Sequence, residues 1–413
     1  MRLGPMRLLP PDAQPEARLL LLGRGLRAFG DGFVSLILPL YLKLLGFHDL
    51  AIGILTAATL AGSAGLTLLV GFRAQRYGHR LLLLGATLLM IGTGMGFALE
   101  TRFWPLLLVG FLGTLNPSSG DVSLFLPLEQ ALLADVTPDR SRTALFAAYS
   151  LTGSLLAALG ALAAGLPEII DALTPLGLLQ SVQAMFALYA LLGLATYLLY
   201  RRLPGQTVHR RASPARPLGP SRRIVLVLAG LFSLDAFGGG FIVQSLLALW
   251  LFDRFGLSVA AAGYFFFGSG LLAAASYLAA ARIARRIGLI NTMVWTHLPS
   301  NLLLALVPFA PNLGAALALL LLRSALSNMD VPTRTSYVMA VVTPEERAAA
   351  ASVTSVPRSL AAAASPVAAG WMLTLSSFGW PLVAAGAIKA VYDLLLLIMF
   401  RHRRPPEERE GRP

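Results

Sequence analysis

The 413-residue sequence contains no cysteine and few charged residues. The absence of cysteine excludes disulfide bonds, thiolate metal sites and cysteine nucleophiles. Only 13% of the residues are charged and 56% are hydrophobic, whereas about a quarter of the residues in an ordinary soluble domain are charged. Lysine is nearly absent, so the basic side chains are almost all arginine, and the formal net charge is +13. This composition predicts a membrane protein.

The sequence also lacks the motifs by which a membrane enzyme would be recognised. It has no His-Glu-x-x-His helix, no Gly-x-Ser-x-Gly elbow and no cluster of metal-ligating residues. The glycine-rich run at 92–96 lies inside an apolar stretch with no strand before it, so it indicates close helix packing and not a dinucleotide loop. We therefore expect no enzyme activity, no cofactor and no metal.

Twelve stretches are long and apolar enough to cross a membrane as helices, which takes about 20 residues each. We predict spans near 18–44, 50–72, 80–99, 103–134, 142–166, 179–200, 223–252, 259–281, 289–309, 313–338, 348–374 and 380–400. The first stretch is too long and too charged for the apolar core of a cleaved signal peptide. The sequence thus predicts an all-α membrane protein with twelve transmembrane helices.

Arginine collects in the loops on one side of these spans, which predicts that both termini are cytoplasmic. Segment 201–222 is basic, has no acidic residue and contains several prolines, so it is predicted to link an N-terminal bundle (1–200) to a C-terminal bundle (223–400). Residues 401–413 form the expected cytoplasmic tail. Attraction to anionic lipid explains the basic linker without a nucleic-acid partner. We expect a monomer in the cell membrane.

The two halves of the sequence repeat one another at offsets of 206 to 210 residues. The repeated motifs are "RAFGDGFV" (27–34) with "DAFGGGFI" (235–242), "LGFHDLAIG" (45–53) with "FGLSVAAAG" (255–263), "AQRYG" (74–78) with "ARRIG" (284–288), and "VTPDR" (136–140) with "VTPEE" (342–346). Two parallel six-helix repeats predict a pseudo-twofold axis along the membrane normal and a binding site at mid-depth between them. The glycines of the octapeptides fit close-packing positions in the first and seventh spans.

These features resemble the major facilitator superfamily over nearly the whole chain. The family's signature between helices 2 and 3 is Gly-x-x-x-Asp-Arg-x-Gly-Arg-Lys/Arg, and residues 71–80 read "GFRAQRYGHR". The matching residues are Gly71, Arg76, Gly78 and Arg80, while Gln75 stands in place of the acid. The resemblance implies that this loop helps to hold the two halves together on the cytoplasmic side as a gating element. The missing carboxylate removes the charged form of that contact.

The resemblance implies a secondary transporter that moves a small organic solute by rocking its two bundles about a central site. The run "SPVAAGWML" (365–373) is similar to helix 11 of drug-exporter-like members, so export is the expected direction, although the helix-5 export signature is absent from 147–167. A proton is the expected coupling ion, because desolvated carboxylates can be tuned to titrate. Proton-coupled uptake of a sugar, organic anion or other nutrient is the alternative. A transport-incompetent scaffold or sensor is the alternative from another class.

Ionisable and polar side chains inside the spans are the candidate substrate and proton sites, because a charge at mid-membrane is costly. In the first half the candidates are Arg27, Asp31, Asn116, Asp121 and Glu129. Arg24, Arg27 and Asp31 share one helix face, which predicts a cavity acid beside a basic gate or, alternatively, a static Arg27–Asp31 pair. The other three follow or flank prolines that interrupt the fourth span, where broken backbone lines a cavity; alternatively, Asp121 and Glu129 are merely solvated at its cytoplasmic end.

In the second half the candidates are Asp235, Gln244, Asp330, Arg358 and Lys389. Asp235 has no basic neighbour one turn away, and the repeat places it opposite Arg27. This predicts an Arg27–Asp235 contact that closes and opens during transport; a hydrogen bond from Ser233, Gln244 or water to Asp235 is the alternative. Lys389 and Asp393 are one turn apart and are expected to form an ion pair, with a substrate contact as the alternative. Arg358 is expected to clamp Asp330 or, alternatively, to hold an anion. His297 and Asn301 are expected to form interior hydrogen bonds, with a proton relay as the alternative.

Overall fold

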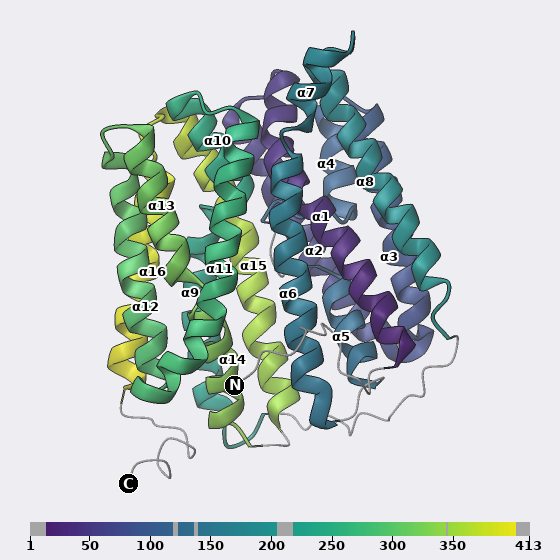
Figure 1. Cartoon of the computed structure of the whole chain (residues 1–413). Helices are drawn as coiled ribbons and strands as arrows, with labels where there is room; N and C mark the ends of the chain where they lie inside the picture. Colours follow the sequence, from purple (N-terminus) through teal and green to yellow (C-terminus); the bar gives the residue numbers. More distant parts are fainter. Residues whose placement is uncertain (1–13, 119–122, 136–138, 205–217, 344–345, 402–413) are drawn as a thin grey trace, which may run out of the picture.

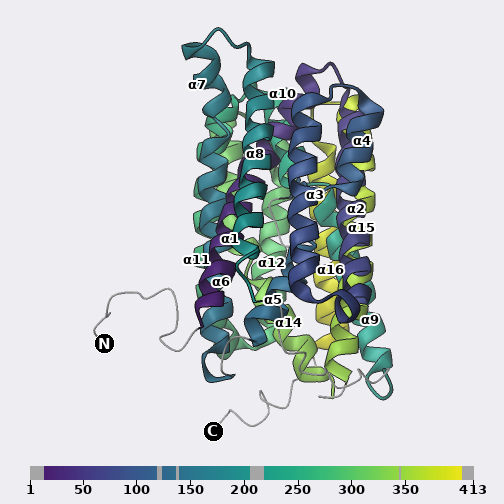
Figure 2. The ribbon, with the colours of Figure 1, turned by 90° about the vertical axis from the view of Figure 1, so that its right-hand side faces the viewer.

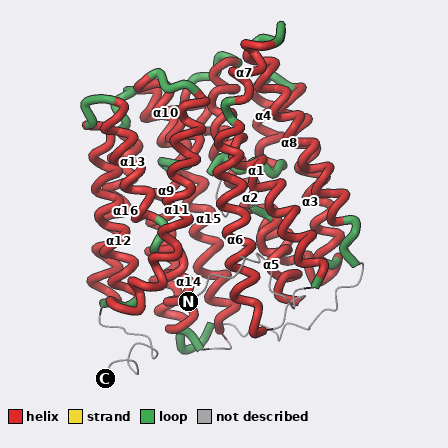
Figure 3. Tube along the Cα trace, viewed as in Figure 1, coloured by secondary structure: helices red, strands yellow, loops and turns green. Residues whose placement is uncertain are grey.

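The structure is a computed structural model that describes residues 14–118, 123–135, 139–204, 218–343 and 346–401. These residues form sixteen α-helices and one short 3-10 helix, with no strand among them (Figures 1 and 3). The helices are α1 (Pro15–Leu44), α2 (Asp49–Tyr77), α3 (His79–Leu99), α4 (Phe103–Leu112), α5 (Phe125–Asp135), α6 (Asp139–Ala163), α7 (Leu166–Leu173), α8 (Leu178–Tyr200), α9 (Arg222–Gly240), α10 (Gln244–Phe255), α11 (Val259–Ile287), α12 (Leu289–Leu306), η1 (Val307–Phe309), α13 (Leu313–Ser327), α14 (Asp330–Val341), α15 (Arg347–Leu375) and α16 (Trp380–Phe400).

The helices make up the twelve predicted membrane spans, whose limits the structure confirms to within a few residues. Within the part of the chain that the structure describes, eight segments are long and apolar enough to cross a membrane by length and composition. The helix count exceeds twelve because α4 with α5, α9 with α10, and α13 with α14 are each one span interrupted near its middle. The remaining short helix, α7, connects the fifth span to the sixth at the face opposite the termini (Figure 1).

Two of the three interruptions lie where the sequence places a proline or polar residues inside a span. The fourth span is broken at 113–124, around Pro117, and the tenth at Asn328 and Met329, shortly before Pro332. The seventh span, predicted at 223–252, is present as Arg222–Phe255, but its break at 241–243 was not predicted. The break directly follows three consecutive glycines, which have the greatest backbone freedom and are the weakest helix formers after proline.

The spans form two bundles related by a pseudo-twofold axis, which confirms the predicted fold class. Figure 1 shows α1 to α8 in purple to teal on one side and α9 to α16 in green to yellow on the other. The bundles meet through two symmetry-related pairs, α2 against α15 and α6 against α11. Figure 2, turned by 90°, shows the spans running roughly parallel, with the start of α1 and the end of α16 at the same face.

The repeated octapeptides lie on α1 and α9, and their glycines allow other helices to pack closely, as predicted. A Cβ atom at Gly30 would lie 2.9 Å from the ring of Tyr189 in α8, and one at Gly238 would lie 2.7 Å from the Lys389 side chain in α16. The glycines two positions later face backbone atoms of α6 and α15 in the same way. Each octapeptide therefore packs the first helix of its bundle against the fifth and sixth spans of that bundle.

The bundles are closed against each other at the face opposite the termini. Gly53, near the start of α2, and Gly263, near the start of α11, are equivalent in the repeat. A Cβ atom at Gly53 would lie 2.5 Å from the carbonyl oxygen of Pro366, and one at Gly263 would lie 2.5 Å from that of Ala161. Helix backbones thus touch across the interface at two symmetry-related points, which the absence of a side chain permits.

Polar contacts add to this closure. The Lys43 ammonium, at the end of α1, lies 2.6 Å from Asp49 and 3.0 Å from Asp253 of α10 in the other bundle. The backbone amide of Val259 donates a hydrogen bond of 2.9 Å to Glu168 of α7. Both contacts join the bundles far from the termini, so the described structure is sealed on that side.

Candidate substrate cavity

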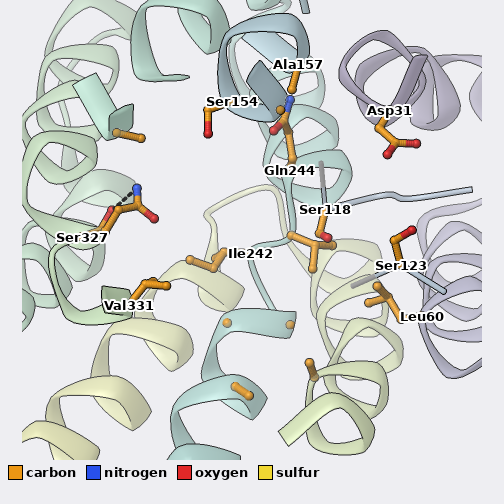
Figure 4. A pocket seen from close by; sticks show the side chains of 18 of the residues that line it. Asp31, Leu60, Ser118, Ser123, Ser154, Ala157, Ile242, Gln244, Ser327 and Val331 are labelled. Atoms are coloured by element: carbon orange, nitrogen blue, oxygen red, sulfur yellow. Dashed lines mark hydrogen bonds between the residues drawn. The ribbon is translucent and has the colours of Figure 1, made fainter. Parts of the chain in front are cut away.

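A cavity of about 790 Å³ lies between the bundles, on the termini side of these closing contacts. Its size suits a small organic molecule, since ligand pockets usually span about 300–1,000 Å³. Figure 4 shows Ser118 and Gln244 in its central part, with Asp31 on one side and Ser327 on the other. All three interrupted spans contribute to the lining, because their free backbone ends and polar residues lie at this depth.

The cavity wall carries more cations than carboxylates. Among the described residues, its charged lining side chains are Arg24, Asp31, Asp235, Arg323, Arg358 and Lys389. The first two come from the first bundle and the other four from the second. Four of the sequence candidates therefore line one cavity: Asp31, Asp235, Arg358 and Lys389. Gln244, at the start of α10, lines it as well.

In the first bundle, Arg27 and Glu129 form a buried ion pair between α1 and α5. Only 2% of the Arg27 side chain and none of the Glu129 side chain is exposed. Glu129 also accepts hydrogen bonds from the hydroxyl groups of Tyr149 and Tyr200, and the Arg27 guanidinium stacks 4.0 Å from the ring centre of Phe125. Neither charged residue lines the cavity, so this cluster is a closed structural unit.

In the second bundle, Asp235 of α9 is held by two cations. Its carboxylate accepts hydrogen bonds from the Lys389 ammonium of α16, at 2.5 Å, and from the Arg334 guanidinium of α14, at 3.1 Å. Arg334 also lies 3.4 Å from Asp330. Because Asp235 and Lys389 line the cavity, this second cluster is open to solute.

The two clusters are related by the repeat with their charges exchanged. Arg27 and Asp235 occupy the same position of the repeated octapeptide. Their partners, Glu129 and Arg334, are each the fifth residue of the second half of an interrupted span, in α5 and α14. The first bundle thus places a cation on its first span and an anion on its fourth, and the second bundle does the reverse.

The structure corrects three expected pairings. Arg27 binds Glu129 and not Asp235 or Asp31, and Asp235 binds Lys389 and Arg334. The expected Lys389–Asp393 pair is replaced by Lys389–Asp235, and Asp330 pairs with Arg334 of its own helix and not with Arg358. Arg27 and Asp235 each find counter-ions inside their own bundle, because a buried ion pair is favourable only at contact distance and the cavity separates the bundles.

The expected interior hydrogen bonds of His297 and Asn301 are present and extend to a third residue. The Asp393 carboxylate lies 2.9 Å from Nδ1 of His297 and accepts a hydrogen bond of 2.8 Å from Asn301. The other imidazole nitrogen lies 3.8 Å from Asp235. The network therefore supports the Asp235 cluster from the side away from the cavity.

The interrupted fourth span is anchored by Asn116 and touches the other bundle. The Asn116 side-chain oxygen accepts hydrogen bonds from the backbone and hydroxyl of Ser118. The carbonyl oxygen of Pro117 accepts a hydrogen bond of 3.0 Å from the backbone amide of Ser245 in α10. The two broken spans thus meet at the sealed end of the cavity. The candidate Asp121 lies outside the described residues.

The predicted gating loop lies at the end of α2 and the start of α3. Gly71, Gln75 and Arg76 lie in α2, and the structure describes only their backbone. Gly78 has a φ of +73° and its repeat equivalent Gly288 has a φ of +89°, and both positive angles favour glycine. The Arg80 guanidinium donates a hydrogen bond of 2.7 Å to the carbonyl oxygen of Arg201, a contact within the first bundle.

Two arginines of the tenth span, Arg323 and Arg334, were not singled out by the sequence reasoning. Both lie inside a membrane span, which by itself marks a residue as a functional candidate. The only candidate named in this span, however, was the acid Asp330. The tyrosines that bind Glu129 could not be found from spacing, because they come from distant spans. Among the described residues, no group of three or more His, Asp or Glu side chains could hold a metal ion.

Comparison with known proteins gives one family match that covers most of the chain. The sequence profile of the Major Facilitator Superfamily matches residues 20–327. The uncharacterized membrane protein YJR124C of Saccharomyces cerevisiae is 25% identical over 426 residues, which covers 94% of this chain and 94% of that protein.

Solved structures share the fold at low sequence identity. A bacterial homolog of the human lysosomal transporter Spinster, in an inward-facing and occupied conformation, has a TM-score of 0.74 at 16% identity and covers 94% of this chain and 97% of its own. The nucleoside transporter NupG has a TM-score of 0.72 at 14% identity, with 94% and 100% covered. A D-xylose-proton symporter has a TM-score of 0.71 at 15% identity, with 92% and 96% covered.

Proposed function

Because this chain belongs to the major facilitator superfamily, we propose that it is a secondary active transporter that moves a small organic solute by alternating access. The observation that carries the proposal is the cavity of about 790 Å³ between two bundles whose helix backbones pack against each other beyond it, at the face opposite the termini. Rocking the bundles about that cavity would expose a bound solute first to one side and then to the other.

The proposed cycle is proton-coupled and runs in the direction of export. We place the termini in the cytoplasm on the arginine distribution, so that the cavity opens to the cytoplasm in this conformation. Asp31 is the proposed proton carrier, because it lines the cavity beside Arg24 and Arg27 while Arg27 is bound to Glu129. The direction rests on the similarity of residues 365–373 to drug-exporter-like members.

The absence of native cysteine provides a direct test of alternating access. Ser355 of α15 is exposed and lines the cavity. Asn291 of α12, in the same bundle, is exposed but does not line the cavity. We expect a transported solute to slow maleimide labelling of the Ser355→Cys variant about threefold or more and to leave the Asn291→Cys variant unchanged. Drugs, sugars, amino acids and organic anions would be screened at two pH values. If no solute changes either rate, the chain is not a carrier of these solutes and the proposal fails.

Coupling and direction are tested in proteoliposomes with the solute that protects Ser355→Cys. If the chain is a proton-coupled exporter, a pH gradient across the proteoliposome membrane should drive the solute from the side that corresponds to the cytoplasm to the other side. The pH inside the proteoliposomes should change as the solute moves. The Asp31→Asn variant should bind the solute but no longer move protons. Solute movement that ignores the pH gradient would refute proton coupling, and accumulation at the termini side would refute export.

A further inference from the structure

Two arginines face the cavity from opposite bundles without a bound carboxylate. Arg24 of α1 and Arg323 of α13 both line it. Only 8% of Arg24 is exposed. The Nε atoms of both are buried and have no hydrogen-bond partner among the described residues. Arg24 stacks 5.2 Å from the ring centre of Tyr149, which orients the guanidinium but does not neutralise it.

The carboxylates of the cavity wall cannot neutralise these cations. The charged lining comprises four cations and two carboxylates among the described residues. Asp235 is already bound by Lys389 and Arg334. Asp31 lies near Arg24 and Asp235 acts on Arg323 at longer range, but among the described residues no carboxylate forms an ion pair with either arginine. A charge at this depth without an ion-pair partner is costly, so the cavity favours an entering anion.

A helix end adds to this positive field. α10 begins at Gln244, which lines the cavity, so the N-terminus of this 12-residue helix lies at the cavity wall, where the amide of Ser245 donates to Pro117. The N-terminal end of a helix carries a partial positive charge, and interrupted membrane helices direct such ends at anionic groups of substrates. This end and the two arginines favour the same sign of charge.

Between the charged groups the wall is partly polar, with serine, threonine and amide side chains such as Ser118, Ser324 and Asn328, and partly apolar. Leu60 and Leu126 of the first bundle and Phe265, Phe266 and Leu320 of the second line the cavity together with several small side chains. A small inorganic anion would leave these apolar side chains in contact with water. A solute with an apolar body and one anionic group would cover the apolar wall and reach the arginines at the same time.

We propose that the solute is an amphipathic organic anion, a carboxylate, sulfonate or phosphate on an apolar body, whose charged group is recognised by Arg24 and Arg323. This inference rests on the proposed transport function and names the chemical class that the same cavity selects. Arg323 and Arg24 belong to different bundles, so binding of one anion by both also favours approach of the bundles around it.

The test compares four probes that share one apolar body and differ in charge. The full chain in detergent is titrated calorimetrically with naphthalene-1-sulfonate, 1-naphthoate, 1-naphthalenemethanol and 1-naphthylmethylammonium. We expect both anions to bind at least about tenfold more tightly than the alcohol, since hydrogen bonds to charged groups are the strong ones. The ammonium probe should not bind.

Matched variants locate the interaction. Arg323→Gln and Arg24→Gln should each weaken anion binding about tenfold or more and leave binding of the alcohol unchanged. Arg323→Lys should retain most of the preference for anions, because it keeps the charge. Arg223→Gln, at an exposed position of α9, is the control and should bind like the parent chain. Thermal unfolding of each variant shows that it is folded.

The outcomes separate this inference from the proposed function. Equal binding of the alcohol and the anions, tighter binding of the ammonium, or anion binding that is unchanged in both Gln variants would overturn the anion inference. So would a solute that protects Ser355→Cys and carries no negative charge. In all these cases alternating access would still stand. Failure of every solute to alter labelling at Ser355→Cys would instead overturn the transport function itself.

Discussion

The two bundles contain the same buried contact with opposite polarity, and they use it differently. In the first bundle the Arg27–Glu129 pair is enclosed by tyrosines and an aromatic ring and is hidden from the cavity. In the second bundle the Asp235–Arg334 pair is joined by Lys389 and reaches the cavity wall. The fold therefore requires an ion pair between the first and fourth spans of each bundle, whichever span supplies the cation. The additional charge of the second bundle, on Lys389, lines the cavity and is available to a solute.

The largest expected effect is a difference in stability between the two pairs. Glu129→Gln leaves Arg27 buried without a counter-ion, which costs about 3–5 kcal/mol in the free energy of unfolding. Asp235→Asn should cost less, about 1–3 kcal/mol, because Arg334 keeps Asp330 and Lys389 faces the water of the cavity. Thermal unfolding in detergent ranks the two variants against the parent chain and the exposed control Arg223→Gln. A larger loss for Asp235→Asn would refute the distinction between a closed and an open cluster.

The exchange of polarity makes a prediction about charge reversal. The double variant Arg27→Asp with Asp235→Arg should be no more stable than the worse of the two single variants, because each residue has its partner inside its own bundle. By contrast, Arg27→Glu with Glu129→Arg should recover part of the melting temperature that either single change loses. Melting temperatures of the four single and two double variants decide the matter. Recovery across the bundles, with none inside the first, would contradict the assigned partners.

The smallest expected effect concerns an anchor that the structure describes only in the second bundle. Glu346, before α15, accepts hydrogen bonds from the backbone amides of Gly219 and Ser221. Hydrogen bonds from Ser221 and Gly219 hold the pKa of this carboxyl below its usual value. The position corresponds to Arg140 in the first bundle.

A lowered pKa means that the ionised form stabilises the folded state. The contribution of Glu346 should be complete above the ordinary glutamate pKa of about 4.3 and should be lost as the pH falls through the lowered value. Glu346→Gln should therefore be slightly less stable than the parent at neutral pH and should lose less stability on acidification below pH of about 4. Melting temperatures of both chains measured at matched pH values test this. Parallel curves would show that Glu346 does not contribute.

Much of the fold could be predicted from the sequence, because a membrane helix leaves a strong apolar signal and the repeat fixes the relation of the halves. The break at 241–243 was missed, since glycine lowers helix stability without forbidding helix as proline does. Which residues face the cavity was partly predictable, because charges such as Asp31 and Lys389 stand out in apolar runs.

The partners of these charges could not be predicted. Helical spacing constrains contacts within one span, whereas Arg27 meets Glu129 over a separation of 102 residues and Lys389 meets Asp235 over 154. The repeat related Arg27 to Asp235 by symmetry, and symmetry equivalence was mistaken for proximity. The better inference from the same repeat is that the partners are themselves equivalent, as Glu129 and Arg334 are.

The hydrogen bond from Ser245 to Pro117 shows how weakly the sealed face is held. To open that side, the two broken spans must release this backbone hydrogen bond, whose net contribution is about 1 kcal/mol. The Lys43–Asp253 ion pair and the Val259–Glu168 hydrogen bond must break as well, and the glycine contacts must separate. A bound solute shifts the balance between the two conformations by the difference between its affinities for them, about 1.4 kcal/mol for each tenfold ratio. A modest preference for one conformation is therefore comparable to each of these contacts, so the occupant of the cavity can reset the balance in every cycle.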